Sequence, residues 1–108
     1  MSQSLIYVTT SNRDEALTLA RSLVTARLVA CANVLDSATS LYWWEGKVQE
    51  EPEAVIICKT RAALVDSVVA RVTELHSYAC PCIVVLPIIA GNPAFLQWIE
   101  AETAPLAR

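Results

Sequence analysis

The chain has 108 residues, a net charge of −3 and a hydrophobic fraction of 55%. It has no cluster of basic residues, which argues against nucleic acid or an anionic membrane as its main partner. Its longest uninterrupted apolar run, residues 81–90, has about half the length that a membrane-spanning helix needs. The first residues also lack the features of a signal peptide, so we expect a cytoplasmic protein whose four cysteines are reduced.

The first half of the chain predicts a strand, a helix and a second extended segment. Residues 4–9 are β-branched and aromatic, as is typical of a strand. Ser11 or Asn12 can cap a helix over residues 12–28, where apolar side chains recur at helical spacing. Residues 30–44 are then predicted to be extended. A tight turn follows them, because the glycine after Glu45 accepts a positive φ.

The second half predicts two more strands and two more helices. Residues 54–60 form a third strand, and Pro52 predicts a bulge or a sheet edge because it has no amide hydrogen to donate. A second amphipathic helix covers residues 61–76, and a fourth strand covers residues 82–89. Asn92, followed by a proline, starts a short last helix.

The order of these elements, β-α-β-β-α-β with an extra C-terminal helix, is the ferredoxin-like plan. We therefore predict an α+β fold with a single domain over residues 1–108. In this plan, two helices cover one face of a four-stranded antiparallel sheet.

Several predicted strands are apolar on both faces, which a monomer of this plan does not explain. Alternate positions in residues 54–58 and 82–86 carry apolar side chains on both sides, and residues 41–44 are bulky throughout. A half-open antiparallel sheet normally alternates apolar and polar positions. The pattern predicts a symmetric homo-oligomer packed through the second face, the alternative being partial cover by the last helix.

The segment 75–82 holds the only histidine and two cysteines. His76, Cys80 and Cys82 are ligand types that suit copper(I) or zinc, although their spacing matches no usual zinc motif. A second interpretation is an exposed His76 that binds metal alone, at a junction between helix and strand. Cys31 and Cys58 lie among apolar neighbours, so core packing is the default prediction for both.

No catalytic residue is predicted, because the chain has no nucleophile-elbow motif and no phosphate-binding glycine pattern. Lys59 is the basic residue considered for a ligand cleft. The alternative is that it lies at a strand end and extends its side chain into solvent. Three aromatic residues precede the turn: Tyr42, Trp43 and Trp44. Two roles are open for them, a platform on which a ligand stacks, or packing across strands or between subunits. We favour the packing role.

Five segments in this order resemble the CutA family of divalent-ion-tolerance proteins over nearly the whole chain. They are "RLVACANV", "TSLYWWEGKVQE", "ICKT", "LHSYACPCIVVLP" and "GNPAFLQWI". The resemblance implies a small, cytosolic, ferredoxin-like homotrimer with an architecture similar to that of PII signalling proteins. It also implies a role in tolerance to copper and other divalent cations, with no established catalytic activity and no organic cofactor.

The chain departs from the family pattern in the segment after the second helix. His76, Tyr78 and Pro81 match the family's H-P-Y-x-x-P, but Ser77 replaces the first proline, and Cys82 stands where the family often has a carboxylate. Thiols in place of carboxylates favour copper(I), zinc or cadmium. Tyr78 is expected to shape a cleft near a subunit boundary. The alternative function is a PII-like scaffold that binds a small anionic ligand or a partner protein in such a cleft.

Overall fold

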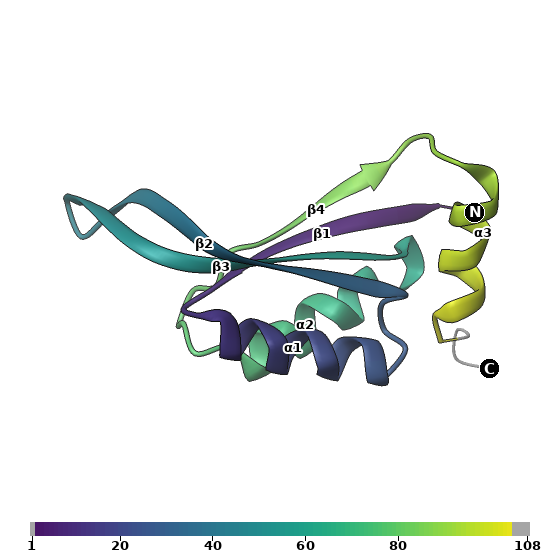
Figure 1. Cartoon of the computed structure of the whole chain (residues 1–108), viewed down its shortest axis with the longest axis horizontal. Helices are drawn as coiled ribbons and strands as arrows, with labels where there is room; N and C mark the ends of the chain where they lie inside the picture. The colour runs from purple at the N-terminus through teal and green to yellow at the C-terminus, as the bar shows by residue number, and fades with distance from the viewer. Residues whose placement is uncertain (1, 105–108) are drawn as a thin grey trace.

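The computed structural model describes residues 2–104 and has the predicted ferredoxin-like α+β fold (Figure 1). The elements, in chain order, are β1 (Gln3–Thr10), α1 (Arg13–Thr25), β2 (Cys31–Trp44), β3 (Lys47–Arg61), a 3₁₀ turn (Ala62–Leu64), α2 (Val65–Leu75), β4 (Ile83–Ile88) and α3 (Pro93–Glu102). The four strands form one antiparallel sheet in the order β2-β3-β1-β4.

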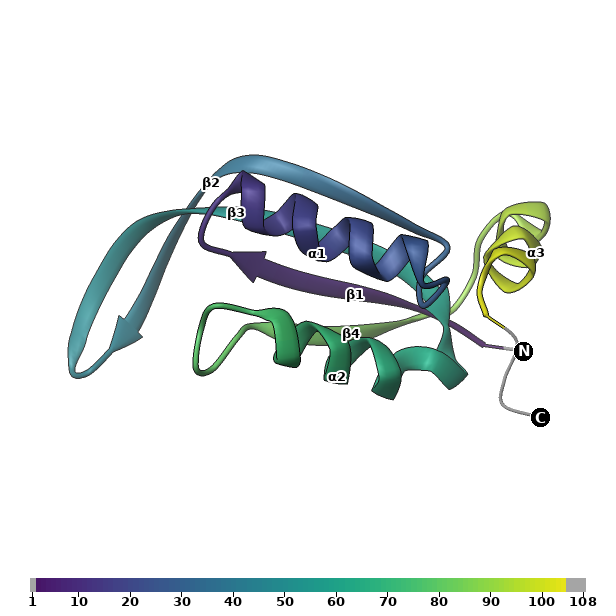
Figure 2. The same cartoon turned by 90° about the horizontal axis from the view of Figure 1, so that it is seen from below.

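The core lies between this sheet and the layer formed by α1 and α2 (Figure 2). Ile6 pairs with Cys58 and Val8 pairs with Ile56, so these four side chains share the face that the helices cover. All four are fully buried. The prediction that Cys58 is a core residue is therefore confirmed, and its burial raises the pKa of the thiol to about 12.

The second face of the sheet carries apolar side chains that no described layer covers. Figure 1 shows α1 and α2 on one side of the sheet, with α3 beside its end and not over its other face. Val84 and Leu86 on β4 are 48% and 49% exposed, and Leu35 on β2 is 50% exposed. Full burial of an exposed side chain of this kind is worth about 1.5–3 kcal/mol, and roughly half of that remains to be gained at each of these half-exposed positions, so this surface favours a partner.

The β2–β3 hairpin extends well beyond the rest of the sheet (Figure 1). β1 pairs with β3 only as far as Ala54, so residues 47–53 of β3 pair with β2 alone. Pro52 therefore lies at an edge, as predicted, and β2 bulges between Leu35 and Ala38, close to it. This geometry holds the hairpin beyond the ends of the helices, where it forms part of the floor of a groove.

Several boundaries differ from the sequence-based prediction. α1 ends at Thr25, three residues early, because Arg27 adopts a left-handed φ of 58° and the Leu28 N–H donates to the Leu23 carbonyl. β3 begins seven residues earlier than predicted, because the hairpin continues the β2–β3 pairing. The predicted N-cap of α3 is confirmed, since Asn92 accepts a hydrogen bond from the Ala94 N–H.

Candidate functional site

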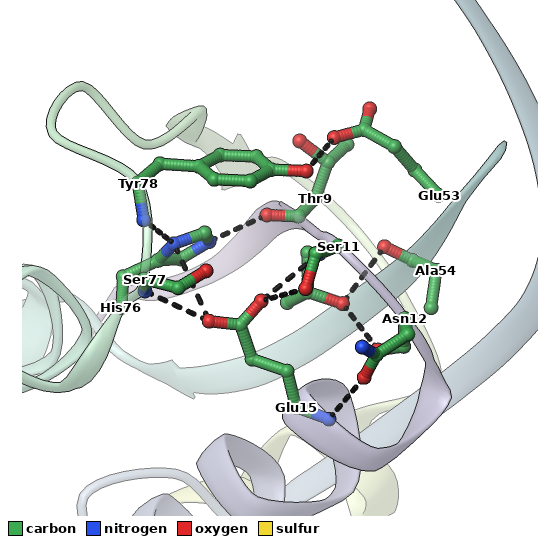
Figure 3. Close-up of polar contacts among 10 residues, drawn as sticks. Thr9, Ser11, Asn12, Glu15, Glu53, Ala54, His76, Ser77 and Tyr78 are labelled. Atoms are coloured by element: carbon green, nitrogen blue, oxygen red, sulfur yellow. Dashed lines mark hydrogen bonds and ion pairs between the residues drawn. The ribbon is translucent and has the colours of Figure 1, made fainter. Parts of the chain in front are cut away.

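His76 lies at the C-cap of α2, and its side chain is 0% exposed. The Nε2–H donates to the Thr9 carbonyl at 2.7 Å, and Nδ1 accepts the Tyr78 N–H at 3.0 Å (Figure 3). This pattern requires a neutral ring with its proton on Nε2. The prediction that His76 is exposed is wrong, because the chain turns at the helix end and directs the ring toward the end of β1.

Glu15, in the first turn of α1, links the segment that follows α2 to the start of α1. One carboxylate oxygen accepts the N–H and the hydroxyl of Ser11, and the other accepts the Ser77 N–H at 2.8 Å (Figure 3). Partial burial alone would raise the pKa of Glu15, but these hydrogen bonds outweigh it and lower the pKa to about 2. Glu15 is therefore a fixed negative charge, 3.7 Å from Nδ1 of His76.

Tyr78 extends from this junction toward the hairpin. Its hydroxyl donates to Glu53 on β3 at 2.8 Å (Figure 3), and its ring lies 4.7 Å from that of His76. Burial, and then the hydrogen bond to Glu53, raise the pKa of Tyr78, so the phenol remains a donor. Tyr78 thus links the loop between α2 and β4 to the base of the hairpin.

Cys80 and Cys82 follow Tyr78, and both are exposed. Within residues 2–104, no three histidine, cysteine, aspartate or glutamate side chains converge as a metal-ligand set. Both ring nitrogens of His76 are already hydrogen-bonded. The structure therefore does not bring His76 together with the two cysteines as a three-ligand site.

A groove of about 780 Å³ lies between this loop and the hairpin. β1 and the hairpin form its floor, mostly through residues on the face turned away from the helices. One side is formed by Tyr78, Ala79, Cys80 and Cys82. Its aromatic lining residues are Tyr7, Tyr42, Trp44 and Tyr78, and its charged lining residues are Glu45, Glu51 and Glu53. Cys80 and Cys82 also line this groove.

Two carboxylates in the groove are oriented by phenols. Tyr42 on β2 donates to Glu51 at 2.8 Å, as Tyr78 does to Glu53. The hydrogen bond to Glu51 raises the pKa of Tyr42. Neither glutamate was predicted from the sequence as a site residue, although their spacing of two on a strand was a signal that both side chains point to one face.

The other predicted cleft residues lie elsewhere. Trp43 is 75% exposed, and its position next to Trp44 on the strand places it on the opposite face of the hairpin. Lys59 is half-buried, and its ammonium group donates to Asn33 Oδ1 at 3.1 Å and lies 3.9 Å from the thiol of Cys31, which is also half-buried. Neither Trp43 nor Lys59 lines the groove.

Comparison with known proteins identifies the family of this chain. The family model of the CutA1 divalent ion tolerance protein matches residues 4–102. The chain belongs to this CutA1 family.

The sequence relatives of this CutA1 chain come from plants, animals, bacteria and archaea. It is 39% identical over 99 residues to "Protein CutA 1, chloroplastic" of Oryza sativa, covering 92% of the chain and 56% of that protein. It is 37% identical over 101 residues to "Divalent-cation tolerance protein CutA" of Thermus thermophilus, covering 94% and 98%. The chain thus spans little more than half the length of the plant relatives.

Solved CutA structures have the same fold. The crystal structure of CutA1 from Oryza sativa matches with a TM-score of 0.93 at 38% identity, covering 96% of this chain and 95% of that one. CutA1 from Thermus thermophilus matches with a TM-score of 0.91 at 36% identity, covering 94% and 99%. The names of relatives place them in different compartments, chloroplastic for rice and periplasmic for Archaeoglobus fulgidus. In this CutA1 chain, none of the described helices has the length and apolar character to cross a membrane.

Proposed function

We propose that this CutA1 chain is a non-catalytic, cytoplasmic homotrimer that binds copper or related cations as part of metal tolerance. The family and the relatives named for divalent-cation tolerance support the general role. The observation that carries the metal-binding proposal is the pair of exposed thiols, Cys80 and Cys82, on one side of the groove.

The ligand chemistry of this pair favours soft cations. Cys80 and Cys82 are separated only by Pro81, which biases Cys80 toward extended backbone and the two thiols toward one side of the chain. Thiolates select copper(I), zinc and cadmium over magnesium and calcium. His76 is left out of the proposed ligand set, because a metal would have to displace one of its two buried hydrogen bonds.

The trimer is supported by the apolar second face of the sheet. Val84, Leu86 and Leu35 are about half-exposed there within one chain. Packing of three copies around a threefold axis would bury this surface on every copy and give a closed assembly. The family resemblance supports three copies over two.

The alternative function is a PII-like scaffold that binds a small ligand, and the groove is the observation that favours it. The anionic ligand considered for this alternative needs basic residues at the site. Lys59 binds Asn33, and Arg61 is hydrogen-bonded to Thr103 and to the Glu100 carbonyl, so neither cation faces the groove. The charges of the groove therefore do not support an anionic ligand.

Native mass spectrometry of protein purified without chelator tests both parts of the proposal. We expect the mass of a trimer, with copper(I) retained under reducing conditions. The double variant Cys80→Ser/Cys82→Ser should lose the metal and keep the trimer, and Cys31→Ser is the matched control that should keep both. Metal retained by the double variant would show that other ligands hold it, and a monomer would refute the assembly.

A further inference from the structure

His76 is a titratable side chain that neither the proposed metal site nor the proposed assembly uses. Its side chain is 0% exposed, and its two ring nitrogens bond to the backbone of Thr9 and of Tyr78. Histidine is the side chain whose charge ordinarily changes near neutral pH, so a ring in this position can respond to protons. Because these contacts lie within one chain, the response does not depend on what covers the open face of the sheet.

The two ring nitrogens differ in what a further proton would do. Nε2 faces the Thr9 carbonyl at 2.7 Å, and a carbonyl only accepts, so Nε2 keeps its proton in both charge states. Nδ1 accepts the Tyr78 N–H at 3.0 Å. A proton on Nδ1 would turn this acceptor into a donor that faces another donor. Protonation of the ring is therefore incompatible with the present hydrogen bond of the Tyr78 amide.

Glu15 offers the protonated ring a different partner. Its Oε2 lies 3.7 Å from Nδ1 (Figure 3), a gap that a small movement of the ring would close to hydrogen-bond distance. Burial disfavours a charged imidazole, whereas a carboxylate at this distance favours it. Because the pKa of Glu15 is lowered to about 2, this carboxylate is ionised throughout the range in which histidine titrates. Nδ1 thus has a partner in each charge state.

The other titratable groups near the ring do not replace Glu15 in this role. The ring of Tyr78 lies 4.7 Å from that of His76, and its raised pKa keeps the phenol neutral. Glu53 on β3 accepts the hydrogen bond of this phenol, and Glu74 in the last turn of α2 is exposed. Glu15 is therefore the group that governs the charge response of the ring.

From these observations we propose that protonation of His76 switches the loop of residues 77–82 from an anchored to a released state. In the neutral state Nδ1 accepts the Tyr78 N–H, and Glu15 accepts the Ser77 N–H. In the charged state Nδ1–H donates to Glu15, and the Tyr78 amide turns to solvent. The loop contains no helix or strand, so these two bonds anchor its start. The switch belongs to the fold and is independent of the proposed metal binding.

NMR of the ¹⁵N-labelled chain tests the switch, because His76 is the only histidine and its ring signals identify themselves. Between about pH 8 and pH 5 we expect the Nε2–H tautomer to become the doubly protonated ring while the protein stays folded. Over the same range the Tyr78 amide should lose about tenfold protection against hydrogen exchange, relative to its intrinsic rate. The proposal is overturned if the ring protonates only when the protein unfolds, or if this protection is unchanged once the ring is charged.

Replacement of Glu15 tests its role as the partner of the charged ring. Glu15→Gln should require about tenfold more protons in solution to charge His76, since it removes the nearby negative charge. Asp14→Asn is the matched control, because Asp14 is an exposed carboxylate in the same helical turn. It should change the required proton concentration less than about twofold. Equal shifts in the two variants would overturn the proposal.

Ser77→Pro tests the same step without loss of the carboxylate, should Glu15→Gln fail to fold. The backbone of His76 is extended, with φ −74° and ψ 143°, as the residue before a proline prefers. Proline has no N–H to occupy Oε2 of Glu15, so this oxygen becomes available to Nδ1–H. The ring should then charge at a lower proton concentration than in the wild type. An unchanged or higher concentration in this variant would also overturn the proposal.

Discussion

The backbone N–H of Ser77 donates to a carboxylate oxygen of Glu15 at 2.8 Å, which joins the residue after the C-cap of α2 to the first turn of α1. The resemblance to CutA proteins places a proline at this position in the family pattern, and a proline could not make this bond because it has no N–H. The serine therefore provides a donor, and the low pKa of Glu15 depends partly on it. This contact positions Tyr78, and with it one side of the groove.

Replacement of Glu15 by glutamine should destabilise the protein at pH 7 by about 1–3 kcal/mol, since it removes charge-assisted hydrogen bonds from Ser11 and Ser77. The folded pKa of about 2 lies below the value of the unfolded chain. The stabilisation is therefore complete above the unfolded pKa, near about 4.3, and is lost as the pH falls toward 2. Urea unfolding at pH 7 and pH 3 measures both effects.

Asp14→Asn is the matched control for this experiment, because Asp14 is an exposed acidic residue in the same helical turn. It should cost no more than about 0.3–1 kcal/mol, the usual effect of a charge near a helix N-terminus. If the two variants lose equal stability, or if the gap between wild type and Glu15→Gln is unchanged at pH 3, the hydrogen bonds of Glu15 are not the cause.

Substitution of His76 by alanine should reduce stability by about 2–4 kcal/mol, because it leaves the Thr9 carbonyl and the Tyr78 N–H without their partner and opens a cavity. Copper(I) affinity, measured where the variant is still folded, should remain that of the wild type. Chemical denaturation measures the change in stability, and a competitive copper titration measures the copper(I) affinity. A large loss of copper affinity in the folded variant would restore His76 to the ligand set.

The four cysteines should react with a thiol reagent at very different rates. Cys80 and Cys82 are exposed, whereas Cys58 is fully buried and burial raises its pKa to about 12. Because the thiolate is the reactive form, Cys58 should react only after unfolding. Mass spectrometry after timed alkylation at pH 8 identifies the modified residues. Early modification of Cys58 would show that β3 opens in the native protein.

Introduction of a charge on the open face of the sheet should break the assembly. Light scattering of the wild type should give three times the chain mass of 11.8 kDa. Leu86→Glu places a charge where the proposed interface is apolar, and it should shift the mass toward that of one chain. Val24→Glu on α1 is the control, since Val24 is similarly exposed but lies outside the sheet. A trimeric Leu86→Glu variant would place the interface elsewhere.

The order and type of the elements were predictable from the sequence because they depend on local patterns. Helical spacing of apolar residues located both main helices, and Asn92 before a proline located the start of α3. Apolar residues at both parities of a strand indicated a sheet with two apolar faces, and the structure leaves one of them uncovered. Such signals need no knowledge of what lies across the fold.

The tertiary structure alone decided which side chains are accessible and which of them meet. The sequence placed His76 at a helix end, where exposure is common, but the path of the chain directed the ring toward Thr9 and satisfied both nitrogens. Glu53 and Tyr78 are 25 residues apart, and only the strand register and the turn after α2 bring carboxylate and phenol within 2.8 Å. Contacts between distant segments depend on these backbone paths, which no local pattern encodes. The sequence therefore determined the family and the framework of this protein, and the fold decided the composition of its groove.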